Sequence, residues 1–222
     1  MTPNDTEKFC RQVEYAQSRY AFLTECCSTY DEVDMDHPVK LLPAAAHVDF
    51  VVLCWEASDR VAFVKSRRMQ VTWTLCGLDL HMAMFTRYSR VYIISDDLMK
   101  SELLIERCHF LWQHLPTDKC VQPSCETRKG QSGRGLAYIK FPELNSEING
   151  VSGKPSEMRQ EGATLLHVEE FQNWQWAEES WKAMLPTVQG GGKIVVVGSA
   201  RAGSFFYKLV TDQISMLPSV TA

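Results

Sequence analysis

Charged and hydroxyl side chains directly follow several apolar runs of this 222-residue sequence. Lys65 ends the run VAFVK, and Thr72 follows seven positions later. Glu169 and Glu170 end the run LLHVEE, and Ser199 follows KIVVVG. Ligands of open parallel sheets bind beyond the C-terminal ends of the strands. Cations suit phosphates, a hydroxyl and a carboxylate suit a metal ion, and a second carboxylate can orient water. Together these side chains are the inventory that a Mg²⁺–nucleotide complex requires.

The segment KSRRMQVT, residues 65–72, departs from the standard phosphate loop G-x-x-x-x-G-K-[ST]. Aligning Thr72 with the terminal hydroxyl residue places Val71 at the lysine position and Gln70 at the second glycine. The strict match therefore fails. A lysine at the start of the loop, Lys65, could still reach the same phosphate oxygens, and the following helix N-terminus supplies N–H groups. Glycine at the position of Gln70 would allow close approach and a positive φ.

Strand-like and helix-like segments alternate along most of the chain. We expect strands at 61–65, 90–95, 135–142, 164–170 and 190–200, and helices at 5–27, 44–58, 72–85, 98–115, 174–186 and 203–212. The segments 117–135 and 143–162 read as polar loops. This order predicts an α/β domain with a parallel sheet covered by helices on both faces.

Composition places limits on the function. The net charge of −4 gives no overall basic character, so any contact with nucleic acid must come from a local patch. The sequence has no 18-residue apolar run and its N-terminus is polar, so we expect neither a membrane span nor a signal peptide. Eight cysteines without a signal segment suggest free thiols in a reducing compartment.

Several other residues admit a functional and a structural interpretation. Zinc binding is the weaker interpretation of one cluster, which lacks the Cys-x-x-Cys spacing: Cys108, His109, His114, Cys120 and Cys125. Capping of a helix explains Ser95, Asp96 and Asp97 more simply than a metal site does. His167 fits a hydrogen-bonded core histidine.

Two further groups could contact nucleic acid. Trp174, Trp176 and Trp181 could stack on bases, although their helical spacing favours packing. Arg128, Lys129 and Arg134 lie in a glycine-rich segment, where DNA contact and simple solvation are equally compatible with the sequence.

The segment KSRRMQVTW after a strand resembles the phosphate loop of the large terminase subunit of tailed bacteriophages, in which the lysine often stands at the start of the loop. Three later segments resemble that family in the same order: RVYIISDDLMKSELLIERCHFLWQHLP, EMRQEGATLLHVEEFQ and AMLPTVQGGGKIVVVGSARAGSFFYKLV. The resemblance covers roughly residues 45–210.

The resemblance implies a P-loop NTPase fold of the RecA-like (ASCE) type, with ATP and Mg²⁺ as cofactors. It implies an ATPase motor domain at 45–222, after an N-terminal helical segment and connector at 1–44, without the nuclease domain of the family. The implied activity is ATP hydrolysis that translocates double-stranded DNA into procapsids. The implied partners are DNA, a portal protein, a small terminase subunit and further copies in a ring, with a monomer possible in isolation, in the host cytoplasm and away from membranes.

The resemblance also implies a role for each matching residue. Lys65 would contact the β/γ phosphates in a divergent Walker A loop, whose other nucleotide-binding members are Ser66, Met69, Gln70, Val71 and Thr72. Thr72 and the Walker B residue Glu169, in place of the usual aspartate, would hold Mg²⁺. Glu170 would polarise the attacking water. Arg67 or Arg68 would stabilise γ-phosphate charge, and Ser199, in the coupling motif, would sense the nucleotide.

Two alternatives remain open at this point. The irregular loop and Glu169 also fit a nucleotide-binding assembly module that does not hydrolyse ATP. A helicase-like ATPase that acts on nucleic acid outside packaging is the other alternative.

Overall fold

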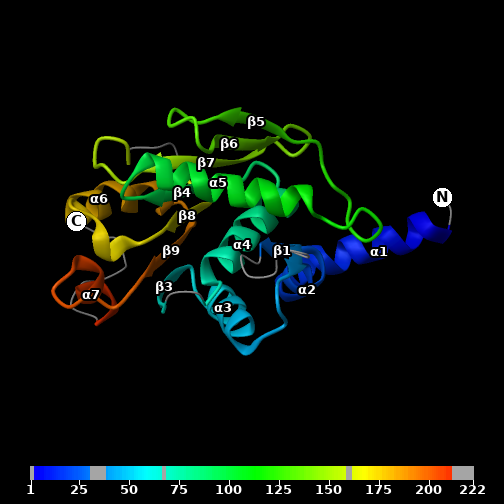
Figure 1. The fold of residues 1–222 in the computed structure, drawn as a ribbon, viewed down its shortest axis with the longest axis horizontal. Coiled ribbons are helices and arrows are strands. Elements are labelled where there is room, and N and C mark those ends of the chain that lie inside the picture. Colours follow the sequence, from blue (N-terminus) through cyan, green and yellow to red (C-terminus); the bar gives the residue numbers. More distant parts are fainter. Residues whose placement is uncertain (1–2, 31–38, 67–68, 159–161, 212–222) are drawn as a thin grey trace.

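A seven-stranded sheet organises the chain (Figure 1). The structure is a computed structural model and describes residues 3–30, 39–66, 69–158 and 162–211. The strand order is β3-β9-β8-β4-β7-β6-β5. The strands span β3 Arg60–Val64, β4 Arg90–Ser95, β5 Glu126–Lys129, β6 Leu136–Phe141, β7 Ser146–Ser152, β8 Leu165–Val168 and β9 Lys193–Gly198, and a separate ladder pairs β1 Ser28–Tyr30 with β2 Val39–Leu41.

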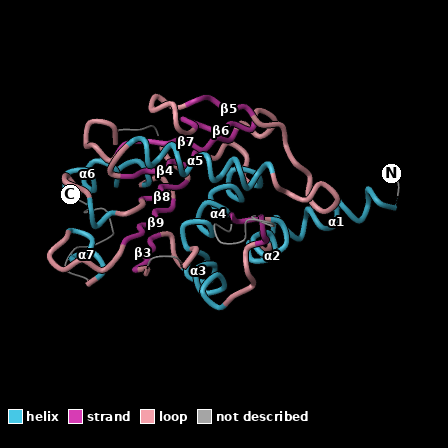
Figure 2. The backbone as a smooth tube through the Cα atoms, viewed as in Figure 1, coloured by secondary structure: helices cyan, strands magenta, loops and turns pink. Residues whose placement is uncertain are grey.

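Helices connect the strands and cover them (Figure 2). They span α1 Pro3–Gln17, α2 Arg19–Cys26, α3 Ala46–Ala57, α4 Val71–Phe85, α5 Leu98–Gln113, α6 Ala177–Met184 and α7 Phe205–Val210, with short 3₁₀ turns at Phe171–Asn173 and Leu185–Val188. Among the described helices, none combines the length and apolar character needed to cross a membrane.

The sheet carries a hydrophobic core on each face. Because side chains alternate along a strand, neighbouring residues of one strand enter different cores. One core combines α2–α5 with Val91, Ile93, Leu165, Val195 and Val197. The other combines α6 and α7 with Ile94, Leu166, Val168, Ile194 and Val196. The predicted α/β architecture with helices on both faces is confirmed, and all eight cysteines are free thiols, as expected.

The sheet is mixed rather than wholly parallel. β3, β9, β8, β4 and β7 run parallel, whereas β6 pairs antiparallel with β7 and β5 pairs antiparallel with β6. The prediction of polar loops at 117–135 and 143–162 was therefore wrong at β5 and β7. The strand β7 buries Ile148 and Val151, but Glu147 and Asn149 flank Ile148, so its sequence lacks the apolar continuity of an inner strand.

The N-terminal region packs into the first core. The predicted helix 5–27 is two helices, divided at Ser18, whose hydroxyl accepts a hydrogen bond from the backbone N–H of Ala21 and caps α2. Phe22 and Leu23 of α2 belong to the same core as α4. A Cβ at Gly77 of α4 would lie 2.4 Å from a Leu23 methyl carbon, so the close contact of α2 with α4 requires glycine there.

Candidate functional site

Three predicted site residues meet at the C-terminal edge of the parallel strands. Lys65 Nζ lies 2.8 Å from Glu169 Oε1 and 2.9 Å from Thr72 Oγ1. Thr72 Oγ1 lies 2.8 Å from the same Glu169 oxygen. The cluster therefore consists of one ammonium, one hydroxyl and one carboxylate in mutual contact.

Each of the three side chains is positioned by the end of a different element. Lys65 follows the last residue of β3, Thr72 lies in the first turn of α4, and Glu169 follows the last residue of β8. β9 lies between β3 and β8, and the Lys65 N–H donates to Gly198 O at 2.9 Å, which extends the β3–β9 pairing to the start of the loop. The strand-end rule thus correctly predicted that these residues converge.

Electrostatics keep Glu169 ionised. Its side chain is only 7% exposed, and burial by itself would raise the pKa of the carboxyl. Hydrogen bonding and charge from His167, together with Lys65, outweigh burial and lower the pKa of Glu169 to about 2. Its second oxygen, Oε2, lies 3.3 Å from His167 Nε2, and His167 Nδ1 lies 2.7 Å from Asp79 Oδ2. His167 is thus a buried, hydrogen-bonded histidine, as the sequence predicted.

The backbone of the loop is left-handed where a standard phosphate loop has its second glycine. Gln70, the residue before α4, has φ 55° and ψ 13°. This is the conformation that glycine adopts at little cost and other residues adopt at a cost of about 1 kcal/mol. The geometry expected of a glycine is therefore present although the residue is glutamine.

The cluster forms one wall of a pocket of about 320 Å³. Sequence reasoning missed two cations that line it from α5, Lys100 and Arg107. Lys100 Nζ lies 2.8 Å from Asp96 Oδ2 and 3.9 Å from Glu170 Oε2. The spacing of Asp96 and Lys100, four residues apart at the start of a helix after a strand, was the signal that could have identified Lys100.

Glu170 lies at the rim of this pocket. Its backbone is also left-handed, with φ 51°, and its Oε2 accepts a hydrogen bond from Asn173 Nδ2 at 3.3 Å. Its side chain is 44% exposed. Glu170 is therefore accessible to water, in contrast to Glu169.

The remaining predicted residues lie at varying distances from the cluster. Ser66 and Met69 are exposed, and the side chain of Val71, the first residue of α4, is buried in the first core. The N–H of Ser199 donates to Gln172 Oε1 at 3.1 Å. Arg67 and Arg68 lie outside the described residues.

The structure distinguishes between the functional and structural interpretations of Asp97, the tryptophans and the cysteine–histidine cluster. Asp97 is the N-cap of α5 and accepts from Met99 N at 3.1 Å, as the capping interpretation predicted. Trp174 and Trp181 are buried, which fits packing, whereas Trp176 is 51% exposed. Among the described residues, the five residues of the weaker zinc interpretation do not form a group of metal-binding atoms; Cys108 lies instead with Cys76 and Asp79.

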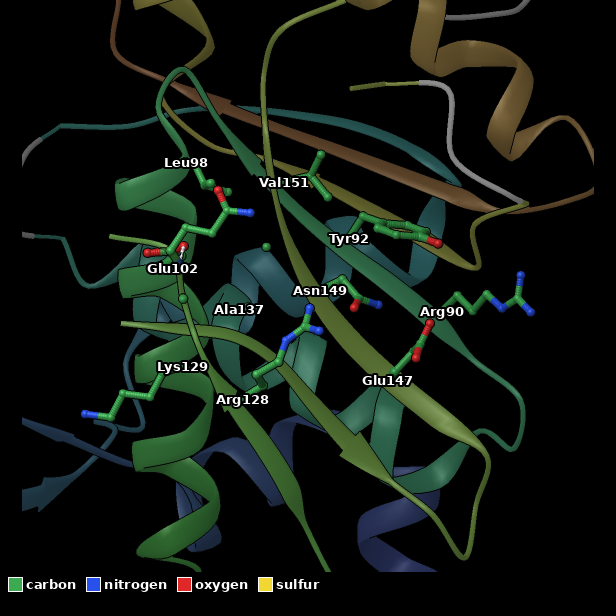
Figure 3. A pocket seen from close by; sticks show the side chains of 13 residues that line it. Arg90, Tyr92, Leu98, Glu102, Arg128, Lys129, Ala137, Glu147, Asn149 and Val151 are labelled. Carbon is green, nitrogen blue, oxygen red and sulfur yellow. Dashed lines mark hydrogen bonds between the residues drawn. The ribbon is translucent and has the colours of Figure 1, made fainter. Parts of the chain in front are cut away.

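A larger pocket, of about 790 Å³, lies over β4, β7, β6 and β5 (Figure 3). Tyr92, Asn149, Tyr138 and Arg128 occupy successive strands in register, and the Arg128 guanidinium lies 4.9 Å from the centre of the Tyr138 ring. The lining mixes cations with carboxylates, including Glu102 and Glu147. It shares no residue with the pocket at Lys65.

Comparison with known proteins gives a match at the level of structure. No family model matches the sequence, and no curated protein matches it. A point-mutant form of the large terminase ATPase domain of Thermus phage P74-26 is 16% identical over 76% of this chain and 69% of that chain, with a TM-score of 0.56. The same domain without the mutation gives 17% identity over 67% and 62%, with a TM-score of 0.50.

The large terminase of bacteriophage HK97 is 11% identical over 93% of this chain, with a TM-score of 0.66. The match covers 45% of the HK97 chain, so this sequence spans less than half of that protein. At these identities the likeness concerns the fold. The mainly parallel seven-stranded sheet and its helices have the P-loop NTPase fold found in the ATPase domain of phage large terminases.

Proposed function

We propose that this chain is the ATPase motor domain of a viral DNA-packaging terminase, which hydrolyses ATP to move double-stranded DNA into procapsids. The fold of the chain supports the proposal. The observation that carries it is the mutual contact of Lys65, Thr72 and Glu169 at the strand edge, beside the N-terminus of α4. That arrangement joins a phosphate-binding cation to the two oxygens that a nucleotide-bound metal needs.

The triphosphate of ATP is bound by positive charge from two sides. Lys65 leaves Glu169 and turns its ammonium to the β/γ phosphate oxygens, and Lys100 and Arg107 face the same pocket from α5. The first N–H groups of α4 have no carbonyl partner within the helix and point toward the loop, where they favour an anion. Gln70 is the residue whose left-handed backbone starts this turn.

The residues present fit a Mg²⁺ ion. Thr72 Oγ1 and Glu169 Oε1 are potential metal ligands that lie 2.8 Å apart. The ionised carboxylate supplies the negative charge that a hard cation prefers. Mg²⁺ usually binds through one or two protein groups with water and phosphate oxygens completing its shell. When bound, it neutralises charge on the transferred phosphoryl group.

Glu170 is assigned to the attacking water. Its exposed carboxylate at the pocket rim orients the water and accepts a hydrogen bond from it as the water oxygen attacks the γ-phosphorus and the bond to the β–γ bridging oxygen breaks. Lys100, 3.9 Å from Glu170, is close enough to hold it in place. Arg67 or Arg68 is assigned to charge on the γ-phosphate, in this copy or a neighbouring one, and Ser199 to sensing the nucleotide.

The proposed partners follow from packaging. They are double-stranded DNA, a portal protein, a small terminase subunit and other copies of this chain in a ring, in the cytoplasm of the host. Arg128, Lys129 and Arg134 are candidate contacts to DNA phosphates, since the β5 residues Arg128 and Lys129 are exposed.

The test is release of phosphate from ATP with Mg²⁺, measured with and without double-stranded DNA. We expect slow hydrolysis by the chain alone, a loss of at least 100-fold in Lys65→Ala and in Glu170→Gln, and retained nucleotide binding only in Glu170→Gln. Lys182→Gln, which removes an exposed cation paired with Glu178, is the control and should leave the rate unchanged.

Two results would favour the alternatives. Tight ATP binding without phosphate release, even with DNA and portal protein present, would indicate a nucleotide-binding assembly module. ATP-dependent separation of DNA strands would indicate a helicase-like enzyme.

A further inference from the structure

Two side chains of α4, one of β8 and Glu169, which follows β8, form two tiers that are joined through Glu169. In the first tier Thr72 Oγ1 donates to Glu169 Oε1 at 2.8 Å. In the second tier His167 Nδ1 lies 2.7 Å from Asp79 Oδ2. His167 Nε2, 3.3 Å from Glu169 Oε2, connects the two tiers. The carboxylate that faces Lys65 through one oxygen therefore contacts a histidine through the other.

The spacing of these residues in sequence accounts for the alignment. His167 and Glu169 are two residues apart along an extended segment, so their side chains lie on the same face. Thr72 and Asp79 are seven residues apart on α4, which is close to two turns at about 3.6 residues per turn. The same face of β8 thus meets the same side of α4 twice, once in each tier.

Each ring nitrogen of His167 faces one carboxylate oxygen. Nδ1 faces Asp79 Oδ2 and Nε2 faces Glu169 Oε2, so the imidazole bridges the two carboxyl groups. His167 and Asp79 are both fully buried, so their geometry is fixed by packing.

We propose that His167 and Asp79 are positioning residues for the nucleotide site: Asp79 orients the His167 ring, and His167 holds Glu169 Oε2 so that Oε1 faces Lys65 and Thr72. The inference rests on the proposed function, because it concerns the carboxylate assigned to Mg²⁺. Groups that orient a metal ligand in this way typically change metal affinity or activity by about 10–100-fold when they are replaced.

Two other interpretations of the second tier can be distinguished from the positioning role. His167 and Asp79 could stabilise the core without affecting the site. Alternatively, Asp79 could bind a buried zinc ion, since Cys76, Asp79 and Cys108 offer ligand atoms within 4.8 Å of one another and Asp79 Oδ1 accepts no hydrogen bond from the described residues. Three ligands fall short of the four that structural zinc sites use, so the positioning role is favoured.

The first measurement compares wild type with His167→Gln in equilibrium binding of a fluorescent ATP analogue and in ATP hydrolysis. With Mg²⁺ removed by EDTA, we expect nucleotide affinity within about 2-fold of wild type, since Lys65 is intact. The affinity gained on adding Mg²⁺, and the kcat, should fall about 10–100-fold, with a much smaller change in KM. Equal kinetics and equal Mg²⁺ dependence in a folded variant would overturn the proposal.

His167→Gln removes the imidazole that faces the buried Asp79 carboxyl group, so a folding defect has to be controlled for. The double variant Asp79→Asn/His167→Gln replaces the pair with two neutral amides and should fold while retaining the loss of the Mg²⁺ effect. His81→Gln is the matched control. His81 is a second buried histidine of α4, bonded to Tyr15 O, so its replacement should alter stability but not the Mg²⁺ dependence.

A third readout does not depend on ATP. NMR of the His167 ring nitrogens reads the two contacts separately: Glu169→Gln should shift the Nε2 signal far more than the Nδ1 signal, and Asp79→Asn should do the reverse. If wild type proves unable to hydrolyse ATP, the proposed function fails while these signals still report on the positioning of Glu169. An Nε2 signal that does not respond to Glu169→Gln, or one equivalent of zinc in the purified protein that is lost in Asp79→Asn, would overturn the positioning role.

Discussion

The Lys65 ammonium and the Glu169 carboxylate lie 2.8 Å apart although 104 residues separate them in the sequence. Their side chains are only 17% and 7% exposed, so the pair is largely shielded from water. Removing one member of such a pair leaves the other charge poorly solvated. The ion pair therefore contributes to stability as well as to the proposed chemistry, and the two contributions can be separated.

Lys65→Met should lower the free energy of unfolding by about 2 kcal/mol, because Glu169 keeps its charge but loses its nearest cation. The double variant Lys65→Met/Glu169→Gln should recover part of this loss, since no unpaired carboxylate remains. Urea denaturation monitored by tryptophan fluorescence measures both values. Lys182→Met, at an exposed pair, should change stability by less than about 0.5 kcal/mol. A loss in the double variant at least as large as in Lys65→Met would contradict this account.

Gln70→Gly should match or exceed wild type in stability, by up to about 1 kcal/mol, because glycine adopts φ 55° without steric cost. Gln70→Val should lose about 1–2 kcal/mol, since a β-branched residue is poorly tolerated there. The same two replacements at Glu106, an exposed residue in the interior of α5, should rank in the opposite order, because glycine is the worse helix former. An identical order at both positions in chemical denaturation would exclude a left-handed Gln70.

His81 should make the protein sensitive to mild acid. Burial lowers the pKa of His81 from 6.5 to about 4, so the folded chain holds the ring neutral while the unfolded chain binds a proton below pH 6.5. This stabilisation is complete above pH 6.5 and is lost as the pH falls toward 4. At about 1.4 kcal/mol for each tenfold change in proton affinity, the loss is on the order of 3 kcal/mol.

The measurement is the free energy of unfolding of wild type and His81→Gln between pH 7.5 and 4.5. Other groups titrate in both proteins, so the informative quantity is the difference between them. The variant should lose stability less steeply as the pH falls. Parallel curves would exclude His81 as the source of acid sensitivity.

Gly198→Ala should destabilise the end of β9 by about 1–3 kcal/mol. A Cβ at this position would lie 2.6 Å from Gln172 Oε1 and 2.7 Å from the Phe206 ring, and Gln172 is the acceptor of the Ser199 N–H. Gly190→Ala, where a Cβ meets no atom within 4 Å, is the matched control and should be close to neutral. Thermal unfolding of the two variants checks the difference, and equal midpoints would contradict the predicted clash.

The sequence predicted the part of the site that depends on strand ends. Lys65 and Glu169 could be placed together because parallel strands deliver their C-terminal residues to one edge, whatever their separation in sequence. Asp79 could not be predicted, because its role depends on which side of α4 faces β8. The strand-end pattern does not predict Lys100, because Lys100 reaches the pocket from the helix that follows the strand.

The errors in the predicted fold have a similar origin. The sequence of β7 predicts a loop because Glu147 and Asn149 flank Ile148, and the structure places both polar residues at a pocket. Apolar continuity identifies inner strands that are buried on both faces, as β9 is, and fails where one face of a strand lines a pocket.

The position of β9 imposes an order on the formation of the site during folding. Among the described strands β9 comes last in sequence, yet it lies between β3 and β8 and separates the strands that precede Lys65 and Glu169. A nascent chain, which is made from its N-terminal side at about 5–20 residues per second, therefore completes this part of the sheet only after residue 198 has been synthesised. Nucleotide binding at Lys65 and Glu169 thus has to wait for a third strand that contributes neither residue.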